Sequence, residues 1–193
     1  PDIDPQHRRR NPNDVSGGGL ITHLTMWAET DEGLVNLMKA STDANLEGRV
    51  MRYPRMDKEI LAKYSKGIIA SSGCPSGIIQ TRLLLGQFDE ALRAAGELQD
   101  IFGRDNFYIE FMDHGLKIEK QVTDGLLDIA KKLNAPLLAT NDSHYVRAED
   151  AGSQDAMLCI NSGSTLDEPG RFKFDGTGYY LKSAEEMREL FKD

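Results

Sequence analysis

Residues 137–145 place a carboxylate, a hydroxyl and an imidazole directly after a short apolar run. Leu137 to Thr140 is predicted to form a buried strand of a mostly parallel sheet, because apolar residues are nearly continuous in such strands. Asp142 and His144 are two residues apart, so in an extended chain both side chains point to the same side. A carboxylate oxygen and an imidazole nitrogen can together bind a divalent metal. Alternatively, Asp142 caps the next helix and His144 is a loop residue, since Asp-x-His is common by chance.

Two further residues of metal-ligand type accompany other predicted strands. His23 lies in the strand expected over residues 20–28, and Cys74 follows the strand expected over residues 67–72. Catalytic and binding residues of parallel α/β sheets lie at the rim formed by the carboxyl ends of the strands, so these side chains are expected near Asp142 and His144. Sulfur, imidazole and carboxylate together suit Zn²⁺ best and tolerate Mn²⁺ or Fe²⁺. Each residue also has a simpler interpretation, Cys74 as a small buried filler and His23 as a core histidine.

The elements that would position these residues alternate regularly between strand and helix. Four strands are predicted, at residues 20–28, 67–72, 106–112 and 137–140, and each is followed by a segment that is predicted to be helical. This alternation predicts an α/β fold with a parallel sheet. The first helix begins at Asp31-Glu32 and is expected to pack Leu34, Leu37 and Met38 on the sheet.

Bulk composition narrows the class of protein. The chain has 193 residues, enough for one domain or for one domain and the start of another. No long uncharged apolar run predicts a membrane span, and no signal peptide is visible. Two cysteines do not form a disulfide framework, which favours a reducing cytoplasm. The net charge of −8 argues against a broad nucleic-acid-binding surface, although a local metal-lined cleft could still bind a phosphodiester.

Five short motifs stand out along the chain, namely Thr22-His23-Leu24, Gly73-Cys74-Pro75-Ser76-Gly77, Asp113-His114-Gly115, Asn141-Asp142-Ser143-His144-Tyr145 and the Phe172-x-Phe174…Tyr180-Leu181-Lys182-Ser183 run. Together they resemble the PHP (polymerase and histidinol phosphatase) domain of bacterial DNA polymerase III alpha subunits. The resemblance covers essentially the whole chain. It implies a distorted βα barrel in which strand ends hold up to nine ligands for three metal ions. His23, Cys74, Asp142 and His144 would be four of these ligands.

The same resemblance implies an internal fragment of the alpha subunit, with the N-terminal strands and the other five ligands missing before Pro1. Residues 1–162 would be the C-terminal part of the PHP domain, and residues 163–193 a linker and the start of the polymerase palm and thumb region. The activity implied is DNA-directed DNA polymerisation with Mg²⁺, on primer-template DNA and dNTPs, with a PHP 3′–5′ exonuclease that acts through metal-activated water. Polymerase carboxylates would lie beyond Asp193, and the fragment alone is expected to be inactive. The implied partners are a sliding clamp, a clamp loader and a proofreading subunit, with no membrane.

Two other functions stay open, a free-standing PHP phosphatase for a small phosphomonoester and a non-catalytic PHP scaffold that docks a proofreading subunit. Four further residues are expected to be structural rather than ligands. His114 would make a turn hydrogen bond, Glu110 would lie within a strand and Cys159 would fill a core. Tyr145 would either touch substrate or pack.

Overall fold

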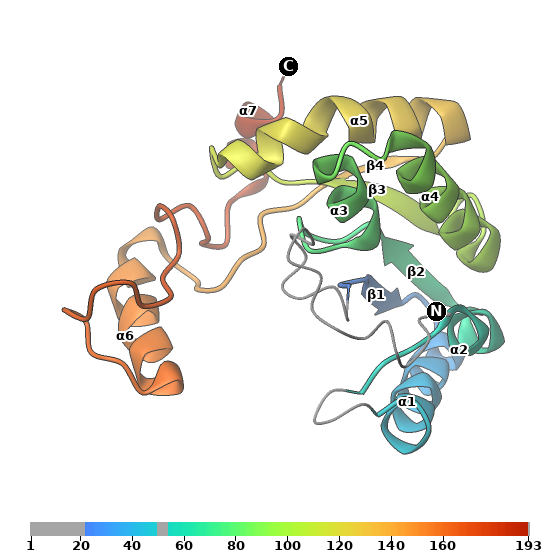
Figure 1. Cartoon of the computed structure of the whole chain (residues 1–193), viewed down its shortest axis with the longest axis horizontal. Coiled ribbons are helices and arrows are strands. Elements are labelled where there is room, and N and C mark those ends of the chain that lie inside the picture. The colour runs from blue at the N-terminus through green and yellow to red at the C-terminus, as the bar shows by residue number, and fades with distance from the viewer. Residues whose placement is uncertain (1–21, 50–53, 193) are drawn as a thin grey trace. The chain divides into compact units, whose positions relative to one another are not determined.

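The computed structural model describes residues 22–49 and 54–192, so the irregular loop predicted for residues 1–19 lies outside the described residues. No helix in these ranges is both long and apolar enough to cross a membrane. The strands are β1 (Thr25–Ala28), β2 (Ile68–Ser71), β3 (Phe107–Phe111) and β4 (Leu137–Ala139) (Figure 1). The helices are α1 (Asp31–Leu46), α2 (Lys58–Tyr64), α3 (Ile78–Leu84), α4 (Phe88–Phe102), α5 (Lys117–Leu133), the short 3₁₀ helix η2 (Ala148–Asp150), α6 (Ala151–Ser162) and α7 (Ala184–Leu190).

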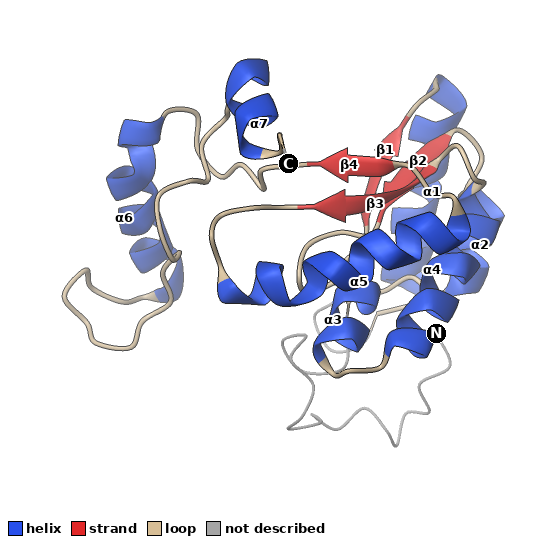
Figure 2. Ribbon diagram, turned by 90° about the horizontal axis from the view of Figure 1, so that it is seen from above, coloured by secondary structure: helices blue, strands red, loops and turns tan. Residues whose placement is uncertain are grey.

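The four strands form one sheet in the order β1-β2-β3-β4. β2 and β3 are parallel, and β3 and β4 run in the same direction in Figure 2. The predicted α/β class with a mostly parallel sheet is therefore confirmed. The parallel orientation predicted for the first strand is wrong, because β1 pairs with β2 in the antiparallel sense. Two helices, α1 and α2, separate β1 from β2 and pack together, so the chain returns to the end of the sheet that it left.

The main core lies between the sheet and the helices α3, α4 and α5 (Figure 2). Burial follows the helical period in α4. The spacing of its apolar residues predicts an inner stripe of Ala91, Ala94, Ala95, Leu98, Ile101 and Phe102, and all of these except Ile101 are buried. The buried apolar residues of this core are Ile68, Ala70, Ile79, Ala91, Ala94, Ala95, Leu98, Phe102, Phe107, Ile109, Val122, Leu126, Ile129, Ala130 and Ala135.

The buried face of α1 differs from the predicted one. Of the three residues predicted to pack inward, Leu37 packs against the core, but Leu34 and Met38 are 47% and 60% exposed. Gly33, Ala40 and Ala44 are the buried residues of this helix. The buried side of the helix therefore consists largely of small residues, which let its backbone approach the neighbouring chain closely. The helix start is as predicted, since the Thr30 hydroxyl accepts a hydrogen bond from the Gly33 amide at 3.1 Å.

The strand predicted over residues 137–140 is present but not buried. β4 comprises Leu137–Ala139, and Leu137 is 53% exposed. The reason is its position at the edge of the sheet, where only β3 pairs with it.

The chain divides into two compact units, residues 1–111 with 121–138 and residues 112–120 with 139–193. The sheet core belongs to the first unit. The second contains α6 and α7. The sequence predicts a capping box at the start of α7, with Ser183 as N-cap and Glu186 three residues later, and the structure confirms it. Ser183 Oγ accepts from the Glu186 amide at 3.2 Å, and Glu186 Oε2 accepts from the Ser183 amide at 2.7 Å.

A partly buried ion pair joins the loop after α6 to that helix. Arg171 donates two hydrogen bonds of 2.6 Å to the two oxygens of Asp155, and its side chain is 8% exposed. We expect Arg171→Ala to lower the melting temperature of the chain by several degrees at pH 7. Arg188→Ala, which removes the exposed Arg188–Glu185 pair, is the matched control and should have little effect.

This difference in melting temperature should depend on pH. The hydrogen bonds from Arg171 hold the pKa of Asp155 below its ordinary value. A carboxyl group whose pKa is lowered by folding stabilises the protein above its unfolded pKa of about 4 and loses that contribution as the pH falls through the folded value. The gap between wild type and Arg171→Ala should thus be full at neutral pH and close below about pH 4. A gap that stays constant down to about pH 2 would contradict this assignment.

Candidate metal centre

The first candidate pair joins the start of β1 to the loop after β2. His23 precedes β1 and Cys74 follows β2. Because these strands are antiparallel, the start of one lies beside the end of the other. His23 Nδ1 lies 3.3 Å from Cys74 Sγ, so the structure brings these two predicted ligands together. The sequence predicted His23 within a strand parallel to the others. In the structure His23 instead precedes β1, whose start lies beside the end of β2 because the two strands are antiparallel.

The loop that carries Cys74 rests on a buried polar network. The Gln80 side-chain amide donates to the carbonyl oxygen of Gly73 at 2.7 Å and to Ser72 Oγ at 3.1 Å. Ser72 Oγ also accepts from the Glu110 amide at 2.9 Å, and Ser71 Oγ donates to the Glu110 carboxylate. These groups are buried, so their hydrogen bonds define one position for the end of β2. The structural role predicted for Glu110 agrees with this geometry.

The second candidate pair is Asp142 and His144. Asp142 Oδ2 lies 3.4 Å from His144 Nε2. The extended conformation assumed for this pair is wrong, because Asp142 has φ 41° and no strand continues past Ala139. The side chains meet across a left-handed turn, a conformation that Asp tolerates better than most residues. Asp142 is not the cap of the next helix, since Asp150 Oδ2 accepts the Arg147 amide there at 3.1 Å.

Aromatic rings and backbone hydrogen bonds hold His144. Its ring centroid lies 4.6 Å from that of Phe174 and 6.1 Å from that of Tyr179. The His144 amide donates to the carbonyl oxygen of Tyr179 at 2.8 Å. Burial raises the pKa of Tyr179, and the carboxylates of Glu119 and Asp142 raise it further. The Tyr179 phenol therefore stays neutral at physiological pH.

Both pairs have donor separations that fit one metal ion. Neighbouring ligand atoms of a tetrahedral Zn²⁺ lie about 3.3–3.8 Å apart, given bonds of about 2.0–2.3 Å. The separation of 3.3 Å between His23 Nδ1 and Cys74 Sγ and that of 3.4 Å between Asp142 Oδ2 and His144 Nε2 agree with this geometry. His23 and Cys74 belong to the first unit and Asp142 and His144 to the second, so the structure tests each pair by itself. In the described ranges no group of three or more His, Cys, Asp and Glu side chains is arranged to hold a metal, and the four-residue set stays a prediction.

Two of the residues predicted to be structural have more specific surroundings than the sequence indicated. His114 is not an exposed turn residue, because its side chain is buried and bonded at both ring nitrogens. Tyr145 packs within the second unit and lines a cavity of about 240 Å³ with Phe174 and residues of α6. Cys159 is buried on α6 with a free thiol, as predicted for a core filler.

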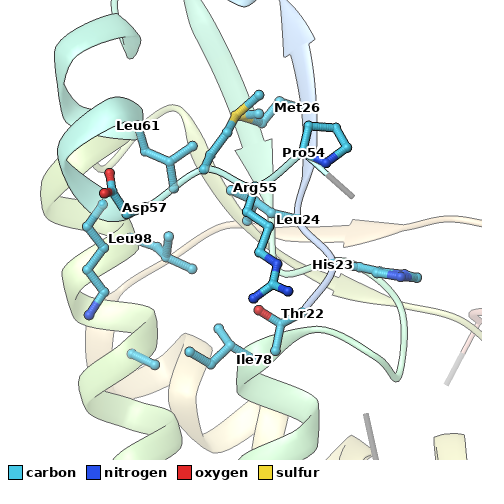
Figure 3. Close-up of a pocket in the computed structure, with 13 residues that line it drawn as sticks. Thr22, His23, Leu24, Met26, Pro54, Arg55, Asp57, Leu61, Ile78 and Leu98 are labelled. Carbon is cyan, nitrogen blue, oxygen red and sulfur yellow. The ribbon is translucent and has the colours of Figure 1, made fainter. Parts of the chain in front are cut away.

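A cavity of about 390 Å³ lies beside the first pair. Leu24, Met26, Leu61, Ile78 and Leu98 give it a largely apolar lining, with Arg55 and Asp57 as polar neighbours. Figure 3 shows the His23 ring directed away from Leu61 and Leu98. His23 nevertheless lines the cavity, so the cavity adjoins the His23–Cys74 pair in the first unit.

Comparison with known proteins agrees with the α/β fold. Residues 6–114 match the family described as the PHP domain. The chain therefore belongs to the PHP domain family.

Three curated relatives of the chain are much longer proteins that share one name. The chain is 59% identical over 178 residues to the DNA polymerase III subunit alpha of Saccharopolyspora erythraea, covering 92% of this chain and 15% of that protein. It is 55% identical over 181 residues to the subunit of the same name from Mycobacterium tuberculosis, covering 94% of this chain and 15% of the relative. It is 39% identical over 185 residues to the subunit of the same name from Thermus aquaticus, covering 96% of this chain and 15% of that protein. The chain thus spans about 15% of the length of the curated relatives that it matches.

Proposed function

We propose that this chain is part of a bacterial DNA polymerase III alpha subunit and contributes to DNA replication in the cytoplasm. The observation that carries the proposal is identity of 55–59% over more than nine tenths of the chain to subunits of that name. The full-length protein would extend primers with dNTPs and Mg²⁺, alongside a sliding clamp, a clamp loader and a proofreading subunit. Residues 1–162 would belong to the PHP domain and residues 163–193 would lead into the polymerase region.

Within that protein we propose that the PHP domain is a metal-dependent 3′–5′ exonuclease. Support comes from the two ligand pairs, whose donor separations suit Zn²⁺, with Mn²⁺ or Fe²⁺ as alternatives. A metal cluster bound there would polarise the phosphodiester and activate a water molecule.

The protein side chains would supply charge and orientation to this site. The Cys74 thiolate and the Asp142 carboxylate would offset the cationic charge, and the imidazoles of His23 and His144 would donate neutral nitrogen. Phe174 and Tyr179 would fix the plane of the His144 ring, as their ring contacts indicate. The hydrogen bonds of Gln80 would keep the Cys74 loop in place.

The test compares a full-length alpha subunit carrying this sequence with the 193-residue chain alone. We expect the full-length subunit to shorten 5′-labelled single-stranded DNA from its 3′ end, to lose this activity with o-phenanthroline and to regain it with Zn²⁺ or Mn²⁺. The chain alone should bind Zn²⁺ weakly and show little nuclease activity, because metal affinity depends on a complete, preformed set of ligands.

Three outcomes separate this function from its alternatives. Hydrolysis of p-nitrophenyl phosphate without exonuclease activity would favour the phosphatase. Primer extension with neither hydrolytic activity would favour the non-catalytic scaffold. Stoichiometric zinc and nuclease activity in the chain alone would contradict the dependence on further ligands.

A further inference from the structure

A buried histidine outside the four predicted ligands holds the backbone that carries one of them. His114 lies after β3, and its side chain is 2% exposed. Its Nδ1 lies 2.6 Å from Glu119 Oε1, and its Nε2 lies 3.0 Å from the carbonyl oxygen of Asn141. Both ring nitrogens thus face oxygen acceptors, and both contacts lie within the second unit.

Glu119 is fixed in turn by the segment that contains His114. Its Oε2 accepts from the His114 amide at 2.8 Å and from the Leu116 amide at 3.1 Å. These bonds compensate for the burial of the carboxylate, whose side chain is 6% exposed. Tyr179 stacks on the His114 ring, with centroids 4.1 Å apart and planes inclined by 13°. The imidazole therefore has one defined position and orientation.

The carbonyl group that His114 reaches belongs to the peptide unit that leads into Asp142. A peptide unit is planar, so a hydrogen bond to its oxygen also orients its amide nitrogen and the next Cα atom. Asp142 has φ 41°, a conformation that costs free energy and persists only where its surroundings impose it. The Asn141 side chain anchors the same residue independently, since its Nδ2 donates to the carbonyl oxygens of Gly178 at 2.8 Å and Tyr180 at 2.7 Å.

We propose that His114 is a positioning residue for the candidate metal ligands Asp142 and His144, with Glu119 holding its ring. The proposal rests on the proposed function in one respect, namely that these two residues bind metal. The Glu119–His114 pair fixes the Asn141 carbonyl, and this contact imposes the left-handed turn that brings Asp142 Oδ2 to His144 Nε2. Groups that orient metal ligands in this way change metal affinity by about 10–100-fold when they are removed.

The test uses His114→Phe and Glu119→Gln in a full-length alpha subunit carrying this sequence. Phe keeps the ring stack on Tyr179 but makes no hydrogen bond to Glu119 or to the Asn141 carbonyl. Amide hydrogen exchange of residues 140–145 in the metal-free protein should accelerate at least about tenfold, and Zn²⁺ affinity by chelator competition should fall about 10–100-fold. Glu119→Gln should shift both measurements in the same direction by less, and it carries the test if His114→Phe does not fold.

Gly163→Ala is the control for general loosening of the second unit. Gly163 ends α6 with φ 69° and has open space around its Cα, so Ala is strained there without touching residues 141–144. This variant should melt at a lower temperature with unchanged exchange of residues 140–145 and unchanged Zn²⁺ affinity. Unchanged exchange in His114→Phe and Glu119→Gln would overturn the proposal, and so would equal effects of Gly163→Ala. If Asp142→Asn and His144→Ala leave Zn²⁺ affinity unchanged, the proposed metal site fails, and the exchange measurement still decides whether His114 holds the turn.

Discussion

Asp142→Asn in a full-length alpha subunit carrying this sequence is expected to reduce exonuclease activity by at least about 1000-fold, since metal-activated chemistry supplies several kcal/mol of transition-state stabilisation. Asn keeps the shape of the side chain and one oxygen, but it removes the negative charge that offsets the metal. His144→Ala should have a similar effect for a different reason, because it removes the nitrogen donor and leaves space for water.

The control for both variants is Ser143→Ala. Ser143 lies between the two residues, and its hydroxyl donates to the carbonyl oxygen of Tyr180 at 3.2 Å. Removal of this exposed hydrogen bond should leave exonuclease activity within about tenfold of wild type, because the net free energy of such a bond is about 0.5–1.5 kcal/mol and about 1.4 kcal/mol corresponds to a factor of ten. The Ser143 variant therefore reports any general disturbance of the turn.

Three measurements on each variant separate the roles of the site. Loss of exonuclease activity with unchanged primer extension and melting temperature supports a catalytic site. Loss of all three together indicates a metal site that stabilises the domain, because metal-binding free energy is also folding free energy. Unchanged exonuclease activity would remove Asp142 and His144 from the site.

The sequence predicted the residue types at the site better than the conformations that bring them together. Cys74 was correctly predicted to follow the second strand, because β2 begins with the β-branched residues Ile68 and Ile69 and Gly73 follows shortly after its end at Ser71. His23 does lie beside Cys74, but the parallel strand on which that prediction rested is antiparallel. The direction of β1 depends on how α1 and α2 return the chain to the sheet, and the local spacing of apolar residues does not predict this. Asp142 and His144 meet through a left-handed turn, whereas the period-two argument assumed an extended chain.

The residues that hold the site were harder to predict than the ligands. Glu119 and His114 are five residues apart, a spacing without a regular period, and their partner Asn141 is distant in sequence. Gln80 supports the Cys74 loop from a helix whose pattern shows only an apolar face. Such roles depend on tertiary hydrogen bonds, which a single sequence does not encode as a pattern. The Asp113-His114-Gly115 motif contributed to the family resemblance, and the sequence predicted only a turn hydrogen bond for His114.

The close contact between α1 and the turn before β2 provides a prediction about stability in the first unit. A Cβ atom built on Gly33 would lie 1.8 Å from the carbonyl oxygen of Gly67, far inside van der Waals contact. The Gly67 oxygen is itself fixed, because it accepts a hydrogen bond from the Glu29 amide at 2.9 Å. Two backbone segments rather than flexible side chains would collide, so the helix must move away from the sheet.

We therefore expect Gly33→Ala to destabilise the chain by about 3 kcal/mol, the upper end of the usual cost of overpacking. Helix propensity alone predicts the opposite sign, since Ala is favoured over Gly within a helix by about 0.5–1 kcal/mol. Gly96→Ala in α4 measures the contribution of helix propensity alone, because its new Cβ would meet only Leu133 Cδ2, at 3.9 Å. Urea unfolding followed by the fluorescence of Trp27, the single tryptophan, measures both variants in the same unit. Opposite shifts of the two midpoints would show that backbone contact at Gly33 outweighs propensity, whereas stabilisation by both substitutions would refute the close approach of α1 to Gly67.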